Sequence, residues 1–144
     1  MEETQGRGYI LKSIGALLTG CVAFAIVLFL ANALLYLLNW TRSTENNWLE
    51  TIFRELASPA AGSYAAMVVA DRLFKTYNKN FVFFGFSALI VAFIAASLTV
   101  IFLVWSSGRF SVYDVIMQTL TAPICIATAY YAYRDEMQKE ESGP

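Results

Sequence analysis

Two long stretches without a charged residue limit this chain more than any other feature. No Asp, Glu, Lys or Arg occurs from Ser13 to Thr41 or from Asn80 to Gly108. Each stretch exceeds the ~20 apolar residues that cross a hydrocarbon core of ~30 Å. Charged residues make up only 15% of the chain, against about 25% in soluble domains. We therefore predict an all-α integral membrane protein, since helices satisfy their own backbone hydrogen bonds in lipid.

The hydrophobic pattern predicts a small four-helix transmembrane bundle. Residues 1–13 precede the transmembrane helical domain, which covers residues 14–133, and residues 134–144 form a charged tail. Aromatic residues near the predicted helix ends support these boundaries, because their rings favour the membrane interface. The predicted spans lie at about 14–38, 59–77, 81–104 and 112–133.

The region between the first and third spans contains two shorter helical patterns. Residues 47–57 predict an amphipathic helix, because their apolar side chains fall on one face. We expect this helix to lie in the membrane surface, the alternative being that it covers the ends of its neighbours. Ser58 and Pro59 suit the start of a new helix. Residues 59–77 are short for a span and could re-enter instead, but lysine and arginine at one end can reach the headgroups.

The distribution of basic residues predicts the orientation, because cytoplasmic loops carry an excess of Lys and Arg. With four spans, Arg42, Arg54 and Arg109 lie on one side. Both termini then lie in the cytoplasm, and the C-terminus stays there even if 59–77 does not cross. We predict a multi-pass protein of the plasma or inner membrane. Seven of the ten basic residues fall on the cytoplasmic side: Arg7, Lys12, Arg72, Lys75, Lys79, Arg134 and Lys139.

Small residues recur every four positions on the second and third predicted spans. Such stripes let helix backbones approach closely in lipid. We expect the two stripes to pack on each other, with packing between protomers as the alternative. The candidate packing residues are Ser58, Gly62, Ala66 and Ala70 on the second span, and Gly85, Ala88, Ala92 and Ala96 on the third.

The fourth span carries a polar stripe that should face protein or water, since polar side chains are costly in lipid. Pro123 lies beside this stripe and removes one backbone donor. The stripe either lines a hydrated cavity or forms a packed seam with hydroxyls bonded to their own helix. At its non-cytoplasmic end, the stripe should lie near polar residues of the first span and near Arg109. These residues would form either a polar vestibule or a local hydrogen-bonded cluster. The candidate residues are Asp114, Gln118, Thr121, Cys125, Thr128, Asn32 and Tyr36.

No residue pattern indicates catalysis, a metal or a cofactor. The chain has no histidine, which removes the commonest general base and zinc ligand. Cys21 and Cys125 lie in separate hydrophobic segments, and we interpret them as small apolar core residues. The net charge of −1 does not indicate nucleic-acid binding, and the chain has no basic cluster of the kind that marks anionic-lipid binding. We do not expect an enzyme.

Two classes of function fit this pattern. The first is a non-enzymatic oligomeric membrane subunit, sensor or scaffold, with the loop between Arg72 and Lys79 and the C-terminal tail as docking surfaces for a cytoplasmic protein. Its partners are the lipid bilayer, further copies of the chain and that protein. The alternative is an oligomeric ion or small-molecule channel or transporter, or a membrane-permeabilising effector, lined by the polar face of the fourth span.

Overall fold

The computed structural model describes residues 2–37, 47–108 and 111–143, with side chains from 6–37, 49–108 and 111–143. Predictions that involve Arg42 or Arg109 therefore lie outside the described residues. Every regular element in these ranges is a helix. In chain order they are α1 (Glu2–Leu37), α2 (Asn47–Ile52), the π-helix η2 (Phe53–Ala57), α3 (Ser58–Leu73), α4 (Lys79–Leu103), the short 3-10 helix η3 (Trp105–Ser107) and α5 (Val112–Glu141).

Helix α1 begins well before the predicted span at residue 14, and α5 continues through most of the predicted tail, to Glu141. Ser111 and Asp114 start α5 with a capping box, in which each side chain bonds the other residue's backbone N–H. Helix α5 also runs through Pro123 without ending.

The predicted break at Ser58 is wrong. Ile52, Ala57 and Ser58 all have right-handed helical backbone angles, so α2, η2 and α3 form one continuous helix. The Ser58 N–H bonds to the carbonyl of Phe53, five residues back, which makes a π-turn immediately before Pro59. A proline tolerates this position because it has no N–H to place. At ~1.5 Å per residue the continuous helix is about 40 Å long.

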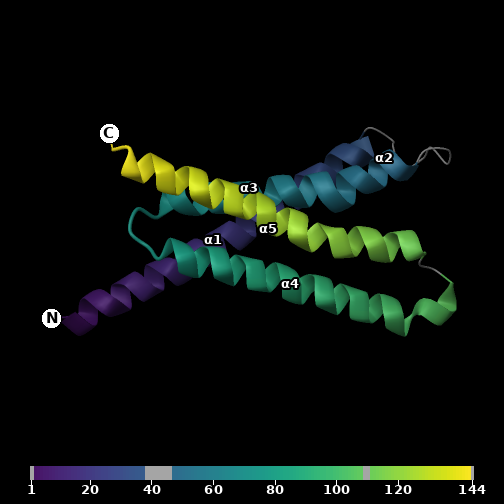
Figure 1. Ribbon diagram of the computed structural model, residues 1–144, viewed down its shortest axis with the longest axis horizontal. Coiled ribbons are helices and arrows are strands. Elements are labelled where there is room, and N and C mark those ends of the chain that lie inside the picture. The colour runs from purple at the N-terminus through teal and green to yellow at the C-terminus, as the bar shows by residue number, and fades with distance from the viewer. Residues whose placement is uncertain (1, 38–46, 109–110, 144) are drawn as a thin grey trace.

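Successive long helices run in alternating directions along the bundle (Figure 1). Both termini and the connection from α3 to α4 lie at one end of the bundle, here called the proximal end. The connection from α4 to α5 lies at the opposite, distal end. Around the bundle, α1 packs on α3, α3 on α5, α5 on α4, and α4 again on α1. The consecutive helices α3 and α4 are thus not packing partners along their length.

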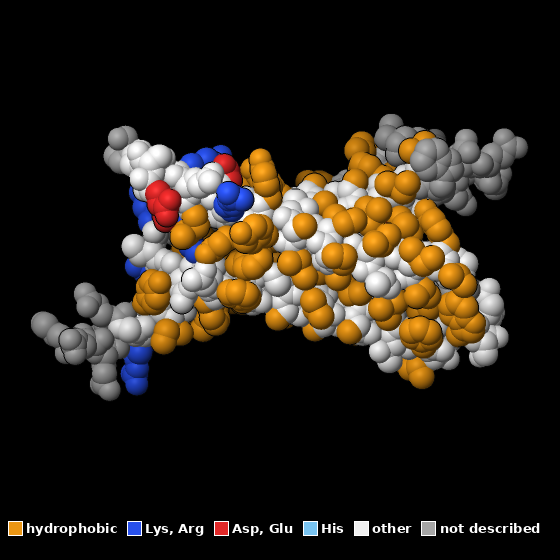
Figure 2. All heavy atoms as spheres, in the orientation of Figure 1, with side chains coloured by type: hydrophobic (Ala, Val, Ile, Leu, Met, Phe, Trp, Pro, Cys, Tyr) orange, Lys and Arg blue, Asp and Glu red, His pale blue; other side chains and the backbone are white. Residues whose placement is uncertain are grey.

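Apolar side chains fill the bundle and also cover its sides. Figure 2 shows hydrophobic side chains along the body of the molecule, and Lys, Arg, Asp and Glu side chains gathered at the proximal end. Of the described helices, α1, α4 and α5 are each long and apolar enough to cross a membrane. The fold is therefore that of a helical membrane bundle. The core includes Ala16, Ala66, Met67, Ala70, Val82, Phe86, Cys125 and Ala129.

Candidate functional site

The distal half of the α5 polar stripe is bonded to η2. The side-chain amide of Gln118 donates to the carboxylate of Glu55 at 3.0 Å. The hydroxyl of Thr121 lies 2.7 Å from the backbone carbonyl oxygen of Glu55 and 2.9 Å from that of Met117. Thr121 is buried. One residue of η2 thus accepts hydrogen bonds from two members of the stripe.

Pro59 explains why the Glu55 carbonyl can accept a bond from another helix. In a regular helix, the N–H of residue 59 would bond this carbonyl, but proline has none. The hydroxyl of Thr121 supplies the missing donor at 2.7 Å. The π-turn and the polar stripe therefore form one structural unit, and π-turns of this kind are frequent at functional sites.

A small cavity of about 90 Å³ lies beside this unit. Its walls include the acids Glu55 and Asp114 together with Gln118, whose side-chain oxygen is buried without a partner. The carboxylate of Asp114 accepts bonds at 2.7 and 2.9 Å from the backbone and hydroxyl of Ser111. Two carboxylates and one amide oxygen can hold water molecules, but the described residues contain no group of three acidic, histidine or cysteine ligands for a metal.

Between Thr121 and the proximal end, the residues of the α5 stripe are packed against other helices or bonded to their own helix. Cys125 is fully buried and lies beside the hydroxyl of Ser63. Thr128 donates to the carbonyl of its own helix at Ile124, at 2.7 Å. Ala129, one turn beyond Cys125, is also fully buried. The proximal half of the stripe is thus a packed seam, and the cavity at Glu55 does not continue along it.

Asn32 and Tyr36 do not join the α5 stripe. Both are exposed, Tyr36 by 72%. The Asn32 amide donates to the carbonyl of Leu28 in its own helix, at 2.9 Å. Among the described residues, the predicted distal vestibule therefore does not include α1.

The small-residue stripe of α3 faces α1. A Cβ atom on Gly62 would lie 2.8 Å from the ring of Phe24, and one on Gly20 would lie 3.1 Å from the carbonyl oxygen of Ala66. Ser58, Ala66 and Ala70 are buried. The absence of larger side chains here lets α1 and α3 approach closely.

The small-residue stripe of α4 divides in two. Gly85 faces α1, where its Cβ would lie 3.0 Å from Leu17. The alanines Ala88, Ala92 and Ala96 are exposed. Ala92 also lines an apolar groove of about 480 Å³ between α1 and α4. The expectation that the stripes of α3 and α4 face each other is wrong, because α3 and α4 are not neighbours along their length.

The proximal end holds a polar network that sequence patterns did not reveal. The Lys79 ammonium lies 2.8 Å from the carboxylates of Asp71 and Glu140. The Tyr77 hydroxyl donates to Asp71 at 3.2 Å. Burial, and then the charge of Asp71, raises the pKa of Tyr77, so it remains a donor at neutral pH. The network joins α3, α4 and α5.

Further bonds add α1 to the proximal end. The hydroxyl of Ser13 donates to the carbonyl of Tyr9 and accepts from the backbone N–H of Asn78, both at 2.9 Å. The Lys12 ammonium lies 3.2 Å from the Thr76 hydroxyl. The sequence signal for the bonds to Asn78 and Thr76 is weak, because their partners stand more than 60 positions away.

No known family model, curated protein or solved structure matches this chain. The class of this protein is therefore inferred only from its fold and its described side chains. It is a helical membrane protein in which most of the described hydrogen bonds and ion pairs between helices lie at the two ends of the bundle.

Proposed function

We propose that the chain is a non-enzymatic, multi-pass membrane subunit that assembles with further copies through the exposed face of α4. In this role it acts as a sensor or scaffold for a protein partner. The observation that carries the proposal is the exposure of Ala88, Ala92 and Ala96. No helix of the same chain covers these alanines among the described residues, and small side chains favour close helix contacts in lipid.

The continuous helix from α2 to α3 supports four spans. Its length of about 40 Å exceeds the hydrocarbon thickness, so its distal residues Glu50 and Arg54 can reach the headgroups. The proximal end then lies in the cytoplasm with both termini, in a plasma or inner membrane. Exposed Arg7, Arg72 and Arg134 at that end agree with the excess of basic residues expected there.

The cytoplasmic loop and tail are the proposed docking surfaces for a protein partner. Arg72 and Lys75 are exposed in and beside the loop. In the tail, Lys139 pairs with Asp135 at 2.8 Å and with Glu136 at 3.0 Å. These side chains lie outside the apolar body of the bundle, where a soluble partner can reach them.

A channel or transporter lined by α5 is less well supported. The packing of Cys125 and Ala129, which are fully buried, leaves no room for a path along the α5 face within one chain. Such a path would require the bonds from Gln118 and Thr121 to Glu55 to open.

Disulfide crosslinking tests the assembly directly. In a chain carrying Cys21→Ala and Cys125→Ala, we expect Ala92→Cys to form covalent dimers in the membrane on mild oxidation. Leu120→Cys is the matched control, because Leu120 is a 44% exposed residue on α5, away from the proposed contact. Equal crosslinking at the two positions, or a monomeric mass in detergent together with no crosslinking at position 92, would refute the proposal.

A further inference from the structure

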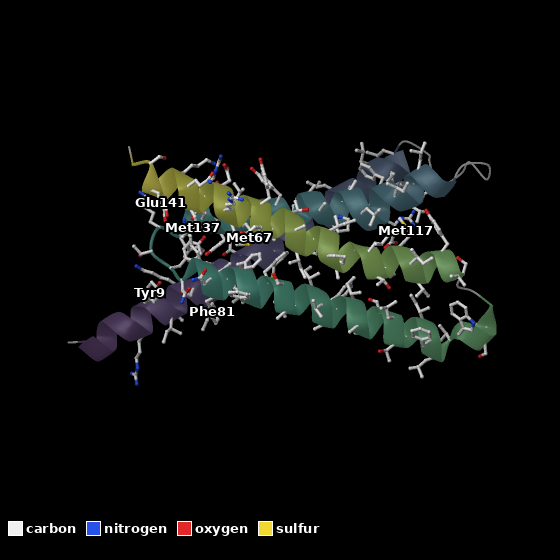
Figure 3. The ribbon with its side chains drawn as sticks, in the orientation of Figure 1. Tyr9, Met67, Phe81, Met117, Met137 and Glu141 are labelled. Atoms are coloured by element: carbon white, nitrogen blue, oxygen red, sulfur yellow. The ribbon has the colours of Figure 1, made fainter. Side chains whose placement is uncertain are left out.

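Two hollows adjoin at the proximal end, one polar and one apolar. The polar hollow, of about 370 Å³, is lined by Lys75, Thr76 and Asn80 among others. The apolar hollow, of about 280 Å³, is lined by Ile10 and Phe81 beside α1. Tyr9 and Asn78 line both hollows. Figure 3 shows Tyr9 and Phe81 together at this end, with Met137 of α5 above them.

Among the described residues, some charged side chains around the polar hollow form ion pairs, whereas others have no partner of opposite charge. Lys79 and Glu140 line it, but they are paired with each other, and Asp71 also pairs with Lys79. Lys75 is exposed, and Lys12 contacts the hydroxyl of Thr76. Within the described ranges, neither Lys12 nor Lys75 has an acidic partner. Lys75 thus lines the polar hollow, and the Lys12 ammonium lies beside it on Thr76, with no described acidic partner for either.

The depth of the hollows matches the headgroup region of a bilayer. Tyr9 precedes the first predicted span, and Phe81 begins the third. Aromatic rings at such positions lie at the interface between headgroups and acyl chains. The polar hollow thus lies at the level of lipid phosphates, and the apolar hollow lies toward the acyl chains.

We propose that the paired hollows bind one anionic phospholipid of the adjoining leaflet. The phosphate occupies the polar hollow, where the Lys75 ammonium, the Thr76 hydroxyl and the Asn80 side-chain amide nitrogen can donate to it. The first part of an acyl chain occupies the apolar hollow beside Ile10 and Phe81. The side chain of Asn78 bonds the backbone N–H of Phe81 at 3.0 Å, which holds the boundary between the two hollows.

Charge complementarity selects an anionic lipid over a zwitterionic one. A choline headgroup brings its own positive charge toward Lys12 and Lys75, whereas a glycerol headgroup does not. A soluble phosphate would use the polar hollow but leave the apolar hollow empty. The proposal does not depend on assembly through α4, so either can fail alone.

Native mass spectrometry of the full chain in detergent tests the proposal, with phosphatidylglycerol and phosphatidylcholine offered at equal concentration. We expect one phosphatidylglycerol to be retained preferentially. Lys75→Gln should lower that retention about fivefold, the effect of ~1 kcal/mol per lysine near an anionic surface. Arg134→Gln is the control, since it removes an exposed charge at the same end but outside the hollows. Thermal unfolding of both variants checks that they remain folded.

Three outcomes would overturn the proposal. Equal retention of the two lipids would show that charge does not select the occupant. Equal losses from Lys75→Gln and Arg134→Gln would show a diffuse attraction rather than a site. Displacement of the lipid by glycerophosphoglycerol, its deacylated headgroup, at equal concentration would show a site for a soluble phosphate.

Discussion

The two ends of the bundle are held together in different ways. At the proximal end, side-chain hydrogen bonds and ion pairs link the long helices to one another or to the connection between α3 and α4. At the distal end, most described bonds stay within one element or its cap, as in the pair of Arg54 with Glu50. The exception is Glu55, which accepts bonds from α5. The proximal bonds are Lys12 to Thr76, Ser13 to Asn78, Lys79 to Asp71 and Glu140, and Tyr133 to Asn80.

This difference indicates at which end of the bundle the helices can separate locally while the rest stays folded. The proximal end is crosslinked through several elements, so separating its helices breaks several bonds at once. At the distal end, one residue of η2 accepts both described side-chain bonds from α5, so separating these helices there breaks two such bonds in addition to their packing contacts. We therefore expect local opening to begin at the distal end, where regions with fewer ties open first.

The largest expected effect comes from Lys79→Met at the proximal end. It leaves the carboxylates of Asp71 and Glu140 without their shared cation, and the Lys79 side chain is only 11% exposed. We expect the free energy of unfolding to fall by about 3 kcal/mol, measured by denaturation with SDS in mixed micelles. Lys139→Met is the control, because Lys139 is exposed and the loss of its ion pairs should change stability far less. Equal losses would contradict the central position of Lys79.

A smaller effect is expected from Ser13→Ala. Ser13 is 3% exposed, and its removal leaves the backbone N–H of Asn78 without its acceptor. The free energy of unfolding should fall by about 2 kcal/mol in the same micelle assay. Ser142→Ala, which removes an exposed bond near the C-terminus, should change stability far less. If both variants unfold alike, Ser13 does not join α1 to the loop.

At the distal end, Thr121→Val should lower the free energy of unfolding by about 1 kcal/mol, because the Glu55 carbonyl loses its donor. In a Pro59→Ala background the loss should shrink, since the new N–H at residue 59 can bond that carbonyl itself. A double-mutant cycle measures this coupling. Additive effects of the two substitutions would show that Pro59 does not free the carbonyl for Thr121.

Parts of the fold could be predicted from single stretches of sequence. The uncharged stretches located α1 and α4, and the charges after Tyr133 located the boundary of the apolar part of α5. Pro59 by itself predicts a helix start, because a proline suits the first turn of a helix. A π-turn also accommodates a proline, and sequence alone does not distinguish the two. The amphipathic pattern of residues 47–57 also does not indicate that Glu55 contacts Gln118.

The choice of packing partners could not be predicted from the stripes of small residues. Gly62 and Ala92 belong to equally regular stripes, yet the first contacts α1 and the second is exposed. Small residues show that a backbone can be approached closely, but not which helix approaches it. The proximal network cannot be predicted from single stretches of sequence for a related reason, since Ser13 and Asn78 meet only after the helices have packed.

The most direct test of this account is the side of the membrane from which each end of the continuous helix can be labelled. Leu49→Cys and Lys75→Cys, each in the chain carrying Cys21→Ala and Cys125→Ala, place single thiols near its distal and proximal ends. A membrane-impermeant maleimide should label position 75 only in inverted vesicles and position 49 only in sealed, right-side-out ones. Labelling of both positions from the same side would contradict a crossing by this helix and, with it, the four-span bundle.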